Sequence, residues 1–290
     1  MPIKSQFVTE DILRDTPLPT HGGNYGVIPH GFIIDETRKE LAIQGIEIKT
    51  ELYKTSADGQ IAQGIYHLAM ASDPDMGLMF AWSNSYNKTM RFKCAVGAHV
   101  FICMNGVVAG DLSNYSRIHK GTSALQDAAN SIKYQLADAF KHYNQLILDK
   151  EMLKSVYLSR KQQSAILGEL FADKEIINIS QMGIIKKEMD APTHIYSGNP
   201  NSAWDFYNHV TLALKDSHPR SYLKDHQDVH RYFVNAFGQL LQYPLTTQEA
   251  VDEEDETDVR EDLIISPAAE VSGSDFDIDV TNNPYLVNFL

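Results

Sequence analysis

The chain has 290 residues, of which 43% are hydrophobic and 22% are charged, an ordinary globular composition that suits one large domain or two small ones. Its net charge of −13 is unevenly spread, because residues 249–290 hold 13 acidic side chains and one basic side chain. The other 248 residues hold 24 basic and 25 acidic side chains. A nearly neutral body therefore carries an acidic tail, and the body-wide positive charge typical of many nucleic-acid-binding proteins is absent.

The lack of targeting signals and the cysteine usage predict a cytoplasmic protein. No run of about 18 apolar residues occurs, and the N-terminus, MPIKSQFVTEDILRD, lacks the apolar core of a secretory signal. Cys94 and Cys103 lie in apolar, strand-like surroundings. We interpret them as reduced core thiols, with a disulfide between adjacent strands as the alternative.

The first 45 residues predict an extended lead-in and one helix. Over residues 1–20, Pro17 and Pro19 disfavour a helix, and a Gly-Gly pair follows as a flexible joint. The segment IPHGFIIDETRKELAIQG predicts a helix with Pro29 in its first turn and Gly45 at its end.

Residues 46–108 predict an antiparallel meander of four to six strands. The segment 46–55 alternates apolar and polar side chains, and the turns SADGQ, SDPDMG and NSYNK separate further strand-like runs. Gly97 interrupts the long run 89–103, which predicts a bend or bulge there. An Asn-Gly turn then leads into VVAG.

From about residue 120 the apolar period changes from two to 3.6, which predicts a long helix over 122–159. Further helices are expected at 160–172, 174–189, 202–216 and 226–241. The fold class is therefore α+β. The expected organisation is a lead-in (1–20), an α+β core (21–155), a helical subdomain (156–245) and an acidic, disordered tail (246–290).

No catalytic signature is present. The glycine-rich segments fit neither a dinucleotide-binding nor a P-loop pattern, and no serine stands in a nucleophile elbow. His226 and His230 would share one face of a helix, and a solvated face is the better interpretation than a metal site. Cys94, His99 and Cys103 could converge, but alternation along a strand points His99 away from its neighbours on the chain, and core packing is the better interpretation. We expect no cofactor, no metal and no catalysis, with an unrecognised enzyme acting on nucleotides as an open alternative.

Two basic loops flank the central strands and indicate nucleic-acid binding. Lysine and arginine would contact phosphates, the aromatic rings would stack on unpaired bases, and the amides and His119 would add polar contacts. The second loop precedes a helix start, which favours an anion. The residues expected to bind are Trp82, Asn84, Tyr86, Lys88, Arg91, Lys93, Arg117, His119 and Lys120. A merely solvated edge is the alternative for each loop.

The tail ends in an apolar cluster, PYLVNFL, after its acidic run. One interpretation is a solubilising tail. The other is a peptide that docks on a partner or covers the basic loops and competes with a polyanion. The tail residues expected to make such contacts are Asp275, Phe276, Tyr285 and Phe289.

Four segments carry a resemblance to a known family: HGGNYGVIPHGFIID, WSNSYNKTMRFKCAVGAHVFICMNGVVAGD, RIHKGT and SAWDFYNHVTLAL. They resemble a phage and plasmid family catalogued as a domain of unknown function, over about residues 20–240. Trp82-Ser83 replaces an arginine-type position of the family pattern, Asn87-Lys88 replaces Asp-Lys, and His209 replaces a helix alanine.

The resemblance implies a phage or mobile-element origin, and with it the cytoplasm of a bacterial host cell, with a place in a virion as the alternative. The order of elements is also similar in outline to the core of single-strand annealing recombinases, which form rings and bind DNA through basic residues. The acidic tail is similar in style to tails of phage single-stranded DNA-binding proteins. We therefore expect a homo-oligomer that binds and anneals single-stranded nucleic acid, with a tail that is autoinhibitory or recruits a phage replication or recombination protein. The alternative is a virion or host-interaction protein with no nucleic-acid role.

Overall fold

The computed structural model describes residues 5–20, 26–69, 73–102, 105–108 and 123–238. Its strands are β1 (Ser5–Val8), β2 (Ile48–Ser56), β3 (Ile61–Leu68), β4 (Met76–Ser85), β5 (Lys93–Val100) and β6 (Gly106–Val108). Its helices are α1 (Glu10–Asp15), α2 (His30–Ile43), α3 (Ala124–Ala137), α4 (Ala139–Ser155), α5 (Arg160–Ala172), α6 (Ile179–Asp190), α7 (Ala203–Leu214) and α8 (Tyr222–Gly238).

The six strands form one antiparallel sheet in the order β1-β2-β3-β4-β5-β6, which confirms the predicted α+β class and the meander. The expected bulge at Gly97 is wrong, because the register runs through it unbroken. A side chain at Gly97 would instead clash with the carbonyl oxygen of Val107 on β6, so glycine permits close strand approach there. The register shift lies between Ile48 and Thr50.

The lead-in over residues 1–20 is not simply extended. Ser5–Val8 pairs with β2 as the edge strand, and α1 follows directly. Arg14 of α1 donates hydrogen bonds to Glu10 and to Asp35 of α2, which ties the segment to the body. Pro17 and Pro19 stand just after α1 ends rather than preventing it.

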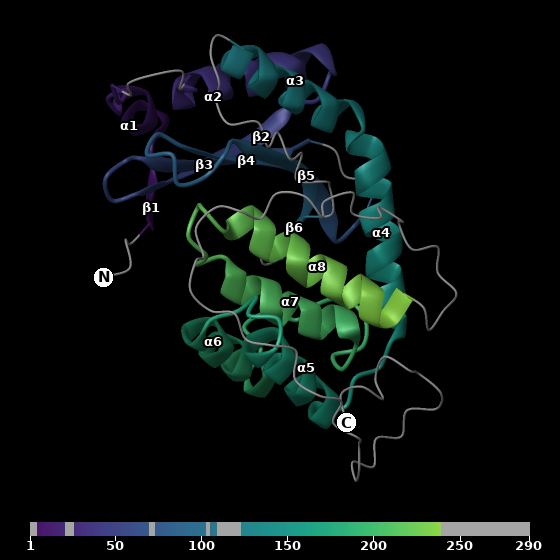
Figure 1. Cartoon of the computed structure of the whole chain (residues 1–290). Coiled ribbons are helices and arrows are strands. Elements are labelled where there is room, and N and C mark those ends of the chain that lie inside the picture. The colour runs from purple at the N-terminus through teal and green to yellow at the C-terminus, as the bar shows by residue number, and fades with distance from the viewer. Residues whose placement is uncertain (1–4, 21–25, 70–72, 103–104, 109–122, 239–290) are drawn as a thin grey trace, which may run out of the picture.

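The two faces of the sheet are covered by different helices (Figure 1). We call face A the side that carries Tyr66, Phe80 and Trp82, because directly paired residues share a face. Helices α2, α3 and α4 cover face A. Face B is the opposite side, and the first turn of α8 packs there through Tyr222 and Leu223.

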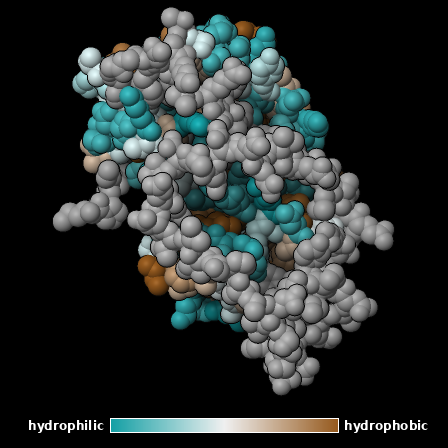
Figure 2. Space-filling view, in the orientation of Figure 1, coloured by the Kyte–Doolittle hydropathy of each residue, from teal (hydrophilic) through white to brown (hydrophobic). Residues whose placement is uncertain are grey.

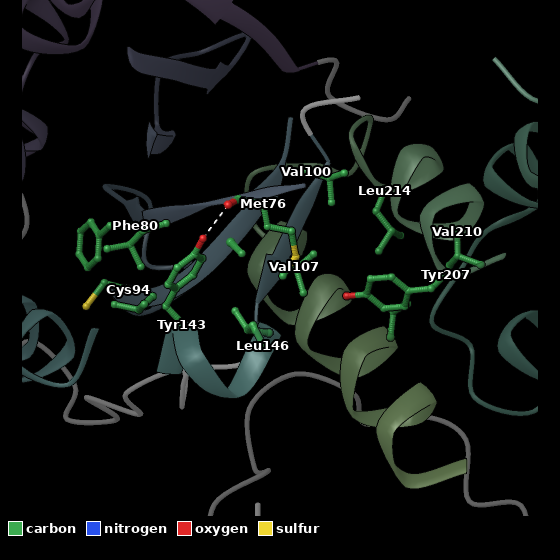
Figure 3. Close-up of a cluster of buried hydrophobic side chains, with 14 of the residues drawn as sticks. Met76, Phe80, Cys94, Val100, Val107, Tyr143, Leu146, Tyr207, Val210 and Leu214 are labelled. Carbon is green, nitrogen blue, oxygen red and sulfur yellow. Dashed lines mark hydrogen bonds between the residues drawn. The ribbon is translucent and has the colours of Figure 1, made fainter. Parts of the chain in front are cut away.

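Helix α4 contacts both the sheet and the helices α7 and α8. Tyr143 of α4 is buried against the sheet, and its hydroxyl donates a 2.6 Å hydrogen bond to the carbonyl of Met76 (Figure 3). The Lys150 ammonium of α4 is buried against Asp73, 2.6 Å away, before β4. One continuous buried cluster therefore runs from α2 to α8, across the boundary expected near residue 155.

Helices form after residue 120 where the sequence predicts them, but several begin or end at other residues than predicted. The predicted helix 122–159 is two helices, α3 and α4, which meet at Asp138. Helix α6 begins at Ile179 rather than near residue 174, because Asn178 and Gln181 form a reciprocal capping box. Helix α8 begins four residues earlier than the predicted start at 226.

Candidate nucleic-acid interface

Two aromatic residues expected to stack on bases are buried in the core. Trp82 lies on face A with none of its surface exposed, and its indole N–H donates to the hydroxyl of Tyr66 at 3.2 Å. The Tyr86 ring is 1% exposed and stacks on His30 with ring centroids 3.9 Å apart. Neither ring offers a free face to a base in this fold, so base stacking by these residues is corrected to a structural role.

Asn84 completes the same structural contact. Its amide nitrogen donates to the carbonyl of Ile28 at 2.8 Å and lies 3.1 Å from Nδ1 of His30. The backbone N–H of His30 donates to the hydroxyl of Tyr86 at 2.8 Å. The sequence segments IPHG and SNSY therefore meet at the N-terminus of α2. Their mutual contacts account for the polar and aromatic residues of both segments through packing rather than ligand binding.

The three basic residues of the β4–β5 hairpin lie nearer the surface. Lys88 is exposed at the hairpin tip with a positive φ of 63°. Arg91 and Lys93 are half-buried, and Lys93 pairs with Ser83, which places it on face B. The remaining residues expected at the interface or in the tail lie outside the described residues: Arg117, His119, Lys120, Asp275, Phe276, Tyr285 and Phe289.

A different basic stretch converges on this hairpin. Burial lowers the pKa of Lys93, and the nearby positive charges of Lys224 and Arg91 lower it further. Arg220 acts in the same direction, and the Asp228 carboxylate opposes them. We call Arg91, Lys93, Arg220 and Lys224 the cationic cluster. It joins the β4–β5 hairpin to the start of α8, about 130 residues later in the chain.

The positive charge continues beyond this cluster. Burial lowers the pKa of His218, and the charges of Arg220 and Lys54 lower it further. Lys54 of β2 is buried, donates to the carbonyl of Lys215 at 2.7 Å, and lies 5.2 Å from the centre of the Phe7 ring. Cationic side chains thus extend from β2 past the α7–α8 segment to β5, with the carboxylates of Asp216 near Lys54 and Asp58 near His218 among them.

Ion pairs only partly neutralise this positive stretch. Lys224 lies 2.8 Å from Asp228, one turn later on α8. The described residues include no such pair for Arg220 or Lys93. In the view of Figure 2, the described surface is mainly hydrophilic, with small separate hydrophobic patches.

The histidines do not form a metal site. His226 and His230 are both buried, so the expected solvated helix face is wrong: α8 packs between the sheet and α4. Nε2 of His230 lies 3.1 Å from the Asp149 carboxylate of α4, and His226 packs on Tyr222. Within the described ranges, no group of three histidine, cysteine or carboxylate side chains is placed to hold a metal ion.

His99 and Cys94 lie on opposite faces, as strand alternation predicted. His99 stacks on His67 on face B, with ring centroids 4.1 Å apart. Cys94 is buried in the core on face A, and Cys103 lies outside the described residues. Of the helices described, none combines the length and the apolar character that a bilayer crossing requires.

Fold and site together define an α+β protein with a sheet between two helical layers and a cluster of cations where β5 meets the start of α8. A family model described as "Domain of unknown function (DUF932)" matches residues 22–234. The chain belongs to that family. No curated protein and no solved structure is similar enough to the chain to match it.

Proposed function

We propose that the protein binds single-stranded nucleic acid through the phosphate backbone at the cationic cluster, and acts by binding and annealing rather than by catalysis. The observation that carries the proposal is the convergence of Arg91 and Lys93 with Arg220 and Lys224. The Asp228 carboxylate opposes these charges at Lys93. A local excess of cations over carboxylates attracts a polyanion.

The burial of Trp82 and Tyr86 changes the proposed mode of binding. Without stacking, affinity comes from phosphate contacts, which are insensitive to sequence and strongly dependent on salt. The base edges of a strand held by its backbone stay available to a complementary strand. Neutralised phosphates also repel that second strand less, and this combination favours annealing.

The same proposal includes assembly into a homo-oligomer, a phage or mobile-element origin, and an acidic tail that inhibits binding or docks on a partner. Residues 249–290 carry 13 acidic side chains and one arginine. Such a segment has the charge needed to compete with nucleic acid for the cationic cluster. A docking role toward a replication or recombination protein is the second use that its apolar end supports.

The test is the affinity of a fluorescent single-stranded oligonucleotide for the full chain across a salt series. Four phosphate contacts predict a slope of log affinity against log salt of about −3 on single strands. No binding at low salt, or binding that does not change with salt, would rule the proposal out.

A second candidate function is a virion or host-interaction protein. The observation that favours it is a set of exposed apolar side chains on α3 and α4: Tyr134, Phe140 and Leu148. Exposed apolar surface of this kind is used in protein–protein contacts. Incorporation of the chain into particles, together with no oligonucleotide binding, would favour this function over the first.

A further inference from the structure

Four polar side chains stand in one line across face B. Lys54 of β2 pairs with Gln63 of β3, Gln63 pairs with Ser83 of β4, and Ser83 pairs with Lys93 of β5. Directly paired residues project from the same face, so all four point to the same side of the sheet. We call them the polar row. With neighbouring strands about 4.8 Å apart, its two lysines stand about 14 Å from each other at the backbone.

The centre of the row is buried and lacks hydrogen-bond partners. Gln63 is 0% exposed and Ser83 is 1% exposed. Neither the amide nitrogen and oxygen of Gln63 nor the hydroxyl of Ser83 has a hydrogen-bond partner among the described residues. A buried polar group without a partner costs free energy, so a sequence that places two of them side by side needs a reason.

The ends of the row are positively charged. The ammonium of Lys54 donates to the carbonyls of Lys215 at 2.7 Å and Ser217 at 3.5 Å, which leaves one of its three protons. Lys93 has three cationic neighbours, and the Asp228 carboxylate that opposes them is 2.8 Å from Lys224. A lysine therefore stands at each end of the row, and within the described ranges Lys93 forms no ion pair.

We propose that the polar row binds one phosphate group, carried either by a nucleic-acid strand or by a small phosphate compound. A phosphate has oxygens pointing in several directions, which suits point charges at two ends and neutral donors between them. A planar carboxylate would be better matched by the two-pronged guanidinium of an arginine, and the row contains none. The inference rests on the proposed function only in that Lys93 belongs to both sites.

The experiment is thermal unfolding of the full chain in inorganic phosphate and in chloride at equal ionic strength. We expect phosphate to raise the unfolding midpoint in a saturable way, because a ligand that binds only the folded state stabilises it. Phosphate also stabilises proteins generally by exclusion from their surface, so the readout is the difference between the wild-type chain and its variants.

The variants are Gln63→Leu and Ser83→Ala, with Lys133→Gln on the other side of the sheet as the control. Each of the first two replaces an unpartnered polar group by an apolar one, so its midpoint in chloride should equal or exceed that of the wild type. Both should lose most of the saturable response to phosphate, and the control should keep it. An identical response in wild type and both variants, or no saturable response in the wild type, would overturn the inference.

Competition identifies the source of the phosphate. If inorganic phosphate at constant ionic strength displaces the oligonucleotide, the row holds a backbone phosphate. If phosphate stabilises the wild type through Gln63 and Ser83 while the oligonucleotide is unaffected, the row serves a small phosphate compound. If no oligonucleotide binds at all but this stabilisation persists, the proposed function fails and the inference stands.

Discussion

The two faces of the sheet use their polar residues in opposite ways. On face A, the indole N–H of Trp82, the amide nitrogen of Asn84 and the hydroxyl of Tyr86 hydrogen-bond to neighbouring groups, although the Asn84 amide oxygen has no partner among the described residues. On face B, all the side-chain polar atoms of Gln63 and Ser83 are buried and unpartnered within the described ranges, beside two lysines. Residues a single position apart in the sequence, such as Trp82 and Ser83, therefore face different surroundings: Trp82 stabilises the core, and we propose that Ser83 belongs to a binding site.

The largest effect is expected from Trp82→Ala, which should lower the free energy of unfolding by about 3–5 kcal/mol. It removes a fully buried ring and leaves a cavity against Tyr66 and His30. Denaturant unfolding measures this change.

Tyr86→Phe should lower the free energy of unfolding by about 1 kcal/mol, because it leaves the backbone N–H of His30 without its acceptor. Neither Trp82→Ala nor Tyr86→Phe should change the slope of log oligonucleotide affinity against log salt at temperatures where the variant is folded. A shallower slope for Tyr86→Phe would indicate that Tyr86 contacts the nucleic acid.

The second effect is a loss of protein stability in acid, which we expect from two buried histidines on face B. Burial lowers the pKa of His67 to about 4 and of His99 to about 3, from a usual 6.5. The unfolded chain takes up protons below about pH 6.5 that the folded histidines refuse, so stability present above that pH is lost as the pH falls toward 4. The expected loss is a few kcal/mol by pH 4. Unfolding of wild type and His99→Gln between pH 7.5 and 4 measures it, and an equal loss in the variant would argue against this source.

A moderate effect is expected from the acidic tail. Replacing the five carboxylates of residues 252–256 by Asn and Gln should raise oligonucleotide affinity at low salt several-fold and less at high salt, because the tail competes electrostatically. The same change should leave the unfolding midpoint unaltered. Unchanged affinity at every salt concentration would indicate that the tail does not cover the cationic cluster.

A further effect on stability is expected from Gly97→Ala, which should lower the free energy of unfolding by about 1–3 kcal/mol. Its added carbon would meet the carbonyl of Val107, on a strand that cannot retreat without breaking its pairing. Gly183→Ala on α6, where an added carbon meets nothing, is the matched control and should not destabilise. Equal stability of both variants would mean that β6 can move away at little cost.

The sequence predicted the fold better than the site, and Trp82 shows why. Turn signals and period-two alternation located the meander, because those are local properties. The same alternation could have placed Trp82 in the core, since it stands two residues after Phe80 and shares its face. An aromatic residue near lysines was instead interpreted as a binding residue. Burial depends on what covers a face, and the covering helix α2 lies about 50 residues earlier.

The cationic cluster was beyond the reach of local reasoning for a related reason. Arg220 and Lys224 stand in a stretch with no basic run, and only tertiary packing of α8 on face B brings them to Lys93. The available signal was a basic pair at a helix start after Pro219, which by itself is common. Likewise, the capping box of Asn178 and Gln181 was legible and would have corrected the start of α6.

The central claim is that the cationic cluster contacts phosphates, and a paired charge removal tests it most directly. Oligonucleotide affinity should be measured across a salt series for wild type, for Arg220→Gln with Lys224→Gln, and for Lys133→Gln with Lys141→Gln on the far side of the sheet. Losing two contacts should make the slope shallower by about 1.4 and weaken binding at low salt, while the control pair matches the wild type. Equal slopes in both variants would contradict the account.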